Sequence, residues 1–378
     1  MISRKEGVTM HIHTITMKSH LTRTEYGTME DFLFDAKTND YGTVYPKNNS
    51  ILFHHNQGGF RLKLYRGKDA NGYYHYIIYL TLNPYNMLNE KSRISTLTLN
   101  GVQIEDFLYT LDDVLSIFPE GLNNAERYDF DRIDLCTDIR MNPSLMAKYL
   151  VFANGAYQPP GVEKNLEMSI TGKKALPCKY RVELESKGCK VIVYNKEHQL
   201  KAQNILDYDS ECAAGILRFE LALKTSMVQR LSLKWTDGTG CIRHKDFLWR
   251  LFEHSEKLFA DAFSGVFFPG NYTSLSNARE IIKGSTYKNP TKEKMISLMK
   301  LTAEHRSIQA AMNDLKAKYP QMNCRKILRL FEKFNELNLN PYPIPVRWEM
   351  NEMPSIPALL RLEWEGPFDK GGNSFYED

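Results

Sequence analysis

Residues 179–196 (Lys-Tyr-Arg-Val-Glu-Leu-Glu-Ser-Lys-Gly-Cys-Lys-Val-Ile-Val-Tyr-Asn-Lys) contain the side chains of this chain that are best suited to chemistry. Apolar and polar residues alternate there, which predicts a β-hairpin with its turn at 186–188. On the second arm, Tyr194 and Lys196 are two residues apart and should share one face of the strand. A phenol and a neighbouring ammonium are groups that can act on a phosphate.

Two other predicted strands carry charged side chains on one face. In residues 132–138, strand alternation sends Ile133 and Leu135 to the core and the polar residues to the opposite face. Residues 217–224 alternate in the same way around Phe219. If both strands neighbour the hairpin, one sheet face combines the phenol and the ammonium with further cations and carboxylates. The residues that these strands add are Arg132, Asp134, Asp138, Arg218, Glu220 and Lys224.

Each group on this face has a role in cleaving a phosphodiester. The oxygen of Tyr194 is a usable nucleophile once deprotonated, although a tyrosine pKa of about 10 disfavours this at neutral pH. Asp134, Glu220 and Asp138 offer oxygen ligands, which favour Mg²⁺ or Mn²⁺ over Zn²⁺. Lys196 and the arginines would stabilise charge on the phosphoryl oxygens. We therefore predict a metal-dependent attack by Tyr194 that leaves a 5′-phosphotyrosine and a free 3′-OH.

A purely structural interpretation of the same residues stays open. A strand tyrosine is usually a packing residue, and this chain has 21 tyrosines. Carboxylates and arginines on a sheet face commonly form cross-strand ion pairs and nothing more. The spatial arrangement of the three strands decides between the two interpretations.

The composition is that of a globular chain with a local excess of positive charge. The 378 residues have a net charge of +4, and residues 173–201 contain eight Lys or Arg and three Glu. This excess indicates a nucleic-acid partner. The six cysteines form no C-x-x-C pair, which favours a reduced, cytoplasmic protein. No apolar run is long enough to span a membrane. The expected DNA contacts are Arg132, Arg218, Arg181, Lys179, Lys190 and Lys224.

The elements that must position this face follow an α+β order. Four predicted strands between residues 10 and 82 precede a helix at 104–118, and a second set of strands and helices follows from 128 to 224. We predict two adjoining sheet-and-helix half-domains of ferredoxin- or RRM-like type, followed by a helical region. The predicted ranges are 1–124 and 125–225 for the half-domains, 226–340 for a helical, DNA-recognising region, and 341–378 for a C-terminal linker and tail.

Three short motifs resemble those of a known family. They are Arg132-Ile-Asp134, the stretch from Val191 to Leu200 around Tyr194, and Leu217-Arg218-Phe-Glu220 with the following Lys224-Thr225. Their order resembles that in the gene II replication endonucleases of filamentous phages, and in the wider Rep_trans-like group of rolling-circle plasmid initiators. The resemblance covers most of residues 10–350 and is dense only at the three motifs.

The resemblance implies a rolling-circle replication initiator of a phage or plasmid. Members of this family nick one strand at the replication origin, stay attached through a tyrosine and then rejoin the displaced strand. By motif, Tyr194 matches the nucleophile and Lys196 the basic residue two positions on. Asp138 matches a second acidic position, which the phage members lack. The implied partners are origin DNA, single-stranded at the nick, a host helicase and a single-strand-binding protein; a homodimer stays open.

Two other functions compete with this prediction. A non-catalytic origin-binding regulator of replication would need the lysines and arginines but not the Tyr194 hydroxyl. A nuclease that releases its product by water attack would need the carboxylates and would form no covalent adduct.

Three other features have weaker interpretations. His11-Ile12-His13 has the form of a metal-binding pair in another nickase superfamily, but it lies far upstream of Tyr194, so two polar residues on an edge strand are favoured. The helices predicted between 307 and 337 favour a bundle pair over a helix-turn-helix. Tyrosines between 73 and 79 are candidates for stacking on single-stranded bases.

Overall fold

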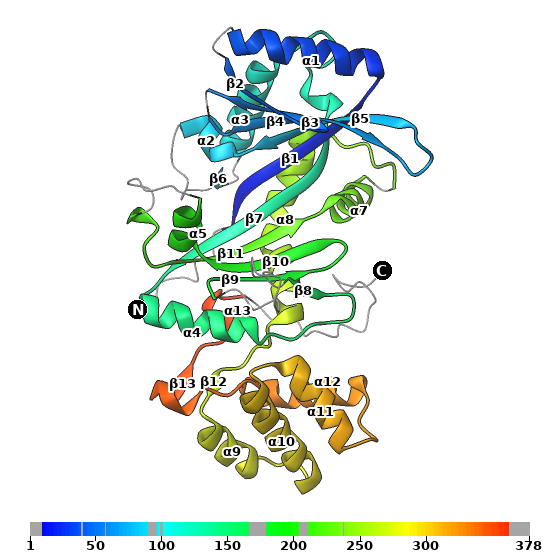
Figure 1. The fold of residues 1–378 in the computed structure, drawn as a ribbon. Coiled ribbons are helices and arrows are strands. Elements are labelled where there is room, and N and C mark those ends of the chain that lie inside the picture. Colours follow the sequence, from blue (N-terminus) through cyan, green and yellow to red (C-terminus); the bar gives the residue numbers. More distant parts are fainter. Residues whose placement is uncertain are drawn as a thin grey trace.

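The structure is a computed structural model, and an antiparallel β-sheet of 11 strands organises it (Figure 1). It describes residues 10–38, 41–56, 58–89, 97–98, 101–165, 179–203, 211–236 and 238–362. Along the sheet the strands follow the order β2-β3-β4-β5-β1-β7-β11-β10-β9-β8, and β6 pairs with β1. The predicted α+β class is confirmed.

The first half of the sheet comes from the N-terminal third of the chain. Its elements are β1 (His11–Leu21), α1 (Arg23–Thr38), β2 (Gly42–Lys47), β3 (Ser50–His55), β4 (Phe60–Lys68), β5 (Tyr74–Leu82), α2 (Pro84–Asn89), β6 (Leu97–Thr98) and α3 (Gly101–Leu115). The second half is built from β7 (Asp129–Arg140), α4 (Pro143–Asn154), β8 (Glu163–Asn165), β9 (Arg181–Glu185), β10 (Cys189–Asn195), α5 (Lys196–Ala202) and β11 (Ile216–Leu223).

The two halves have the same strand connectivity. From the centre outward, the first half runs β1-β5-β4-β3-β2 and the second runs β7-β11-β10-β9-β8. In each half a helix follows the central strand, and the last strand returns beside that central strand. Because β1 and β7 pair with each other, the two predicted half-domains share one sheet across the boundary expected at 124/125. The ferredoxin- or RRM-like type is not confirmed.

Apolar side chains of the sheet pack against helices on one of its faces. Phe219 of β11 makes an edge-on ring contact with Phe263 of α8 (His244–Val266), at 6.0 Å between ring centroids. The ring of Phe130 on β7 lies 5.1 Å from that of Phe247 on the same helix, measured between ring centroids. In Figure 1, α8 passes behind the central strands. Strand alternation therefore leaves the opposite face to the polar residues.

The helical region divides between this core and a separate lobe. Helices α7 (Thr225–Trp235) and α8 contact each other beside the sheet, whereas the lobe at the bottom of Figure 1 contains α9 to α12. These are α9 (Leu275–Gly284), α10 (Asn289–His305), α11 (Ile308–Lys318) and α12 (Cys324–Glu336). The lobe is linked to the body by the strand pair β12 (Tyr272–Thr273) and β13 (Glu352–Met353). Its expected role in DNA recognition stays a prediction.

The segment after α12 is packed rather than open. Tyr342 and Ile344, in the stretch predicted as a stiff linker, are each only 2% exposed, and the Asn340 side chain donates a hydrogen bond to the carbonyl of Phe268. The short helices η2 (Val346–Trp348) and α13 (Ile356–Leu359) follow, and α13 contacts α8. The linker prediction for 341 onward is therefore wrong over the residues up to 362, because apolar side chains anchor this segment to the body.

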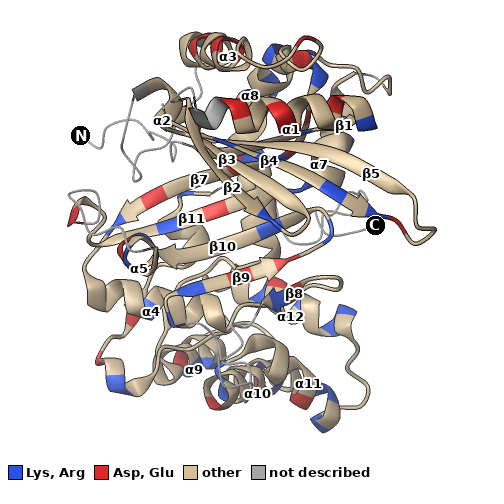
Figure 2. Ribbon diagram, turned by 45° about the horizontal axis from the view of Figure 1, so that its top comes forward, with Lys and Arg blue, Asp and Glu red and all other residues tan. Residues whose placement is uncertain are grey.

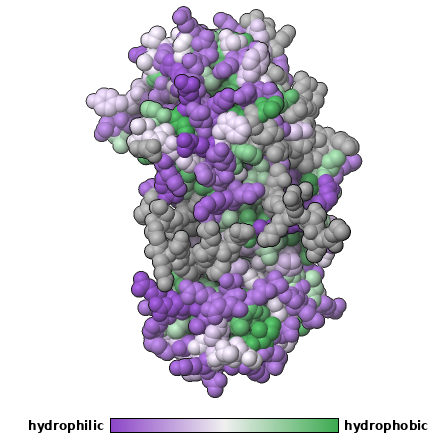
Figure 3. Space-filling model, turned by 180° about the vertical axis from the view of Figure 1, so that it is seen from behind, coloured by the Kyte–Doolittle hydropathy of each residue, from purple (hydrophilic) through white to green (hydrophobic). Residues whose placement is uncertain are grey.

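On the face seen from behind, the described residues are mainly hydrophilic (Figure 3). Apolar side chains show there only in small groups (Figure 3). Within the described ranges, no helix has the length and apolar character that crossing a membrane requires.

Candidate active site

The three predicted strands of the polar face are neighbours in the sheet. β10 pairs with β11 and β11 with β7, so that Tyr194 lies opposite Arg218, which lies opposite Asp138. Residues directly opposite each other in a sheet point to the same face. Figure 2 shows acidic and basic segments recurring along β7, β11 and β9. The local alternation thus brings these charged groups together, as the sequence predicts.

The Tyr194 side chain is buried and hydrogen-bonded. It is 2% exposed, and its hydroxyl donates to Glu220 Oε2 over 3.1 Å. The Arg181 guanidinium lies 5.4 Å from the centre of the Tyr194 ring. Burial, together with the charge of Glu220, raises the pKa of Tyr194 well above its usual value. A phosphodiester can therefore reach this hydroxyl only when neighbouring side chains move, and deprotonation needs local help.

Lys196 approaches the tyrosine from a helix rather than from the strand. β10 ends at Asn195, whose side chain accepts a hydrogen bond from the His198 backbone N–H and caps α5, so Lys196 is the first residue of that helix. The prediction that both groups share a strand face is wrong in this respect. The Lys196 Nζ still lies 6.0 Å from the centre of the Tyr194 ring. Burial and the charge of Arg218 lower the pKa of Lys196 to about 7.

Asp134 and Glu220 form a pair of buried carboxyl groups on neighbouring strands. They are 5% and 6% exposed. Glu220 lies opposite Cys136, two residues from Asp134, so the two acids are diagonal neighbours on one face. Burial and the charge of Glu220 raise the pKa of Asp134 to about 7, although Arg132 binds Asp134 through two hydrogen bonds of 2.6 and 3.2 Å. Bringing a cation to this pair would relieve the repulsion.

Asp138 has a different partner from the other two carboxylates. Both of its oxygens accept hydrogen bonds from Arg218, at 2.6 Å to Nε and 2.7 Å to Nη2. The Arg218 side chain is completely buried, whereas that of Asp138 is 27% exposed. Asp138 therefore neutralises the charge of the buried Arg218 guanidinium. Its role as a metal ligand stays a prediction.

Most of the predicted DNA-contacting cations are engaged with carboxylates. Arg181 and Lys190 both pair with Glu183, and Lys190 also lies 3.0 Å from Glu185. Lys224 lies just beyond β11 and pairs with Glu185 as well. Lys179 is exposed, and its Nζ lies 5.8 Å from the centre of the Tyr180 ring. At the β9 end of the face, Glu183 and Glu185 therefore hold three of the predicted DNA-contacting cations, and Lys179 stays outside these ion pairs.

The two N-terminal histidines lie near the centre of the sheet. β1 is flanked by β5 and β7, so the expected edge position is wrong. A β-bulge between Ile12 and Thr14 interrupts the pairing of β1 with β7 at His13, next to Thr14, which lies opposite Asp134. Burial and the charges of Arg218 and Lys196 lower the pKa of His13 well below its usual value, which keeps the imidazole neutral. The His-x-His spacing was the sequence signal for this neighbour of the site.

The carboxyl pair suits Mg²⁺ or Mn²⁺, which can take their other ligands from water and substrate, better than it suits a metal ion that protein side chains must coordinate completely. Within the described part of the chain, no three His, Cys, Asp or Glu side chains gather as a metal-binding group. Mg²⁺ is commonly held by one or two carboxylates, with water and substrate phosphate as its other ligands. Asp134 and Glu220 supply two such carboxylates, and their position as buried diagonal neighbours on one sheet face is the observation that fits a divalent cation.

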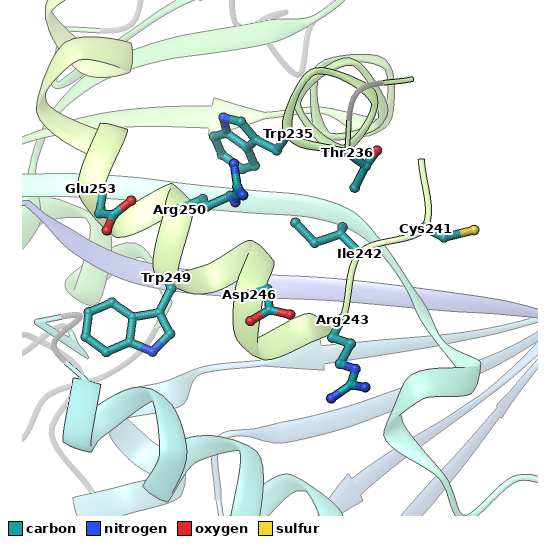
Figure 4. A pocket seen from close by; sticks show the side chains of 9 residues that line it. All are labelled: Trp235, Thr236, Cys241, Ile242, Arg243, Asp246, Trp249, Arg250 and Glu253. Carbon is teal, nitrogen blue, oxygen red and sulfur yellow. The ribbon is translucent and has the colours of Figure 1, made fainter. Parts of the chain in front are cut away.

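Two further features lie outside this cluster. Tyr180 and Tyr208 are the tyrosines that the sequence offers for a second transfer, the one that ends the reaction. Tyr180 stacks on His198 at 3.7 Å between ring centroids and is 37% exposed, whereas Tyr208 lies outside the described residues. A separate pocket of about 700 Å³ lies between the end of α7 and the start of α8. Figure 4 shows that Arg243 and Arg250 line it together with Asp246 and Glu253, and no lining residue comes from β7, β10 or β11.

In comparisons with known proteins, the chain matches no family model, no curated protein and no solved structure.

Proposed function

We propose that this chain is a rolling-circle replication initiator that nicks and rejoins DNA through Tyr194. The observation that carries the proposal is the hydrogen bond from the Tyr194 hydroxyl to Glu220, made beside a second buried carboxyl group and two buried cations. A tyrosine, a carboxylate pair and cations on one sheet face match the needs of phosphodiester cleavage better than those of packing.

The side chains divide the work of the nicking step. The Tyr194 oxygen attacks the phosphorus, forms the phosphotyrosine bond and expels the 3′-oxygen. Glu220, which already accepts a hydrogen bond from this hydroxyl, takes its proton. Lys196, with its pKa of about 7, can be protonated at neutral pH and stabilise charge on the phosphate or give its proton to the leaving oxygen. Rejoining reverses these transfers.

A divalent cation would complete this arrangement. Asp134 and Glu220 would hold Mg²⁺ or Mn²⁺, which polarises the scissile phosphate when bound. Arg218 and Asp138 would fix the positions of the surrounding groups, since their two hydrogen bonds join β11 to β7.

The resemblance to the phage gene II and Rep_trans-like initiators supports the same proposal. It adds origin DNA as the substrate, a host helicase and a single-strand-binding protein as partners, and a cytoplasmic location. The non-catalytic origin-binding regulator remains the competing function, because the basic residues alone would serve it.

A supercoiled plasmid that carries the origin of the chain's own replicon tests the proposal. With Mg²⁺, the wild-type protein should convert it to nicked and relaxed circles, and chelation of the metal should prevent this. Specific binding of the origin without any nicking would favour the regulator. Nicking without a protein–DNA adduct would favour the water-dependent nuclease.

A further inference from the structure

The polar face that holds Tyr194 continues across the other half of the sheet. Thr16 of β1 lies opposite Arg132 of β7 on one side and Thr81 of β5 on the other. Thr81 in turn lies opposite Arg61 of β4. One row of side chains thus runs over four neighbouring strands, all on the same face.

A second row beside it combines an aromatic ring with two cations. Lys18 lies opposite Tyr79, which lies opposite Lys63. The Lys63 Nζ is 5.9 Å from the centre of the Tyr79 ring and 5.3 Å from that of Tyr65. Tyr74 and Tyr76, by contrast, point to the α1 side, where Tyr76 lies 5.0 Å from Tyr26. Among the tyrosines of β5, Tyr79 is therefore the one on the Tyr194 face.

The cations at the two ends of the face differ in their partners. At the β9 end, Arg181 and Lys190 pair with Glu183. On β4, Arg61 and Lys63 are exposed, and neither forms an ion pair within the described ranges. Besides Lys179 just before β9, Arg61 and Lys63 are therefore cations of this face that no carboxylate of the described residues holds, and these two lie beside two tyrosine rings.

We infer that the face of β1, β5 and β4 defined by Lys18, Arg61, Lys63, Tyr65 and Tyr79 binds single-stranded DNA beside the nick. Arg61 and Lys63 contact phosphates, and the tyrosine rings stack on bases, the combination that binds single strands without reading their sequence. Five steps between neighbouring strands separate β10 from β4, or roughly 24 Å at about 4.8 Å for each step. The inference rests on the proposed function, since it assigns the path of the strand that Tyr194 holds.

Binding of a short fluorescent oligo(dT) to the full chain, without metal, tests the inference. The double variant Arg61→Ala/Lys63→Ala should bind about 10-fold or more weakly, and the slope of log K against log salt should fall by about 1.4, or about 0.7 for each phosphate contact. Arg66→Ala/Lys68→Ala is the matched control, because it removes two exposed cations of the same strand that lie opposite Tyr76 and Tyr74, on the other face of the sheet, and it should leave oligo(dT) binding unchanged.

Two variants of Tyr79 separate stacking from charge. Tyr79→Phe keeps the ring and should retain affinity, whereas Tyr79→Leu should lose about 10-fold. A melting temperature equal to that of the wild type shows that each variant is folded. Oligo(dT) containing 5-iodouracil should crosslink to Tyr65 or Tyr79 in the wild type.

The inference is overturned if the wild type does not bind oligo(dT), if the β4 double variant binds as tightly as the wild type, or if the crosslink lies elsewhere. Because binding is measured without nicking, a chain that binds through β4 but forms no Tyr194 adduct would contradict the proposed function alone. A chain that forms the adduct but binds oligo(dT) independently of Arg61 and Lys63 would contradict only the inference that the β4 surface binds single-stranded DNA.

Discussion

The hydroxyl of Tyr194 on β10 and the carboxylate of Glu220 on β11 are joined by a 3.1 Å hydrogen bond. Tyr194 lies directly opposite Arg218, so its hydroxyl reaches a residue two positions further along β11. Both partners are almost fully buried. This contact connects the predicted nucleophile to a group that can take its proton.

Replacing Glu220 by Gln should slow nicking about 100-fold, the lower end of what a general base contributes. The amide oxygen can still accept from Tyr194, but it cannot take the proton and it binds Mg²⁺ weakly. Single-turnover nicking rates at saturating protein measure this, with origin affinity as the control. A nicking rate equal to that of the wild type would remove Glu220 from the chemistry.

Asp134 should make stability depend on pH. Its pKa is raised to about 7 in the folded chain. The protonated Asp134 carboxyl therefore stabilises the fold fully at a pH below its pKa in the unfolded chain, and this stabilisation is lost as the pH rises to about 7. Asp134→Asn should lack this loss and at pH 8 be more stable than the wild type by about 1 kcal/mol or more.

Denaturant titrations at pH 5 and pH 8, with and without Mg²⁺, measure this effect. Mg²⁺ should stabilise the wild type at pH 8 and have little effect on Asp134→Asn. Equal Mg²⁺ stabilisation of both proteins would place the cation elsewhere.

Lys196→Ala should reduce the nicking rate by about 100-fold while origin binding is retained, because the side chain acts on charge that develops in the transition state. Lys201→Ala is the matched control, since Lys201 lies on the same helix and forms an exposed pair with Glu197. Equal rates for the two variants would show that Lys196 only packs beside the tyrosine.

Asp138→Asn should destabilise the fold by about 2–3 kcal/mol, because it weakens the charge pair of the buried Arg218. This is below the effect of a fully buried pair, since Asp138 is 27% exposed. Glu197→Gln, which breaks an exposed pair, should cost less than about 0.5 kcal/mol. If Asp138→Asn kept full stability but lost the response to Mg²⁺, Asp138 would be a metal ligand.

Local patterns predicted the strands of the site, and long-range contacts explain what they missed. Period-2 alternation located β7, β10 and β11 and the polar face they share, since alternation depends only on neighbours along one strand. The position of β1 beside β7 depends on pairing between segments more than 100 residues apart. A local sequence pattern cannot predict such a pairing, which is why the sequence favours an edge strand for His13.

Side-chain partners were harder to predict than strand faces. Lys196 has the spacing of a strand residue, but the Asn195 cap starts a helix there. Arg181 and Lys190 were expected to contact DNA, yet the β9–β10 register places Glu183 within reach of both. Arg61 and Lys63 form no ion pair within the described residues, and nothing in the sequence distinguished them from other surface cations. A residue's partner depends on register, which composition does not determine.

The most direct test of the central claim is the identity of the residue that becomes linked to DNA. After reaction with origin DNA and Mg²⁺, nuclease and trypsin digestion should yield peptide 191–196, in which Tyr194 is the only tyrosine, with a nucleotide attached through phosphate. The adduct should be absent in Tyr194→Phe and unchanged in Tyr180→Phe. An adduct on any other peptide, or nicking that survives in Tyr194→Phe, would contradict the assignment of Tyr194 as the nucleophile.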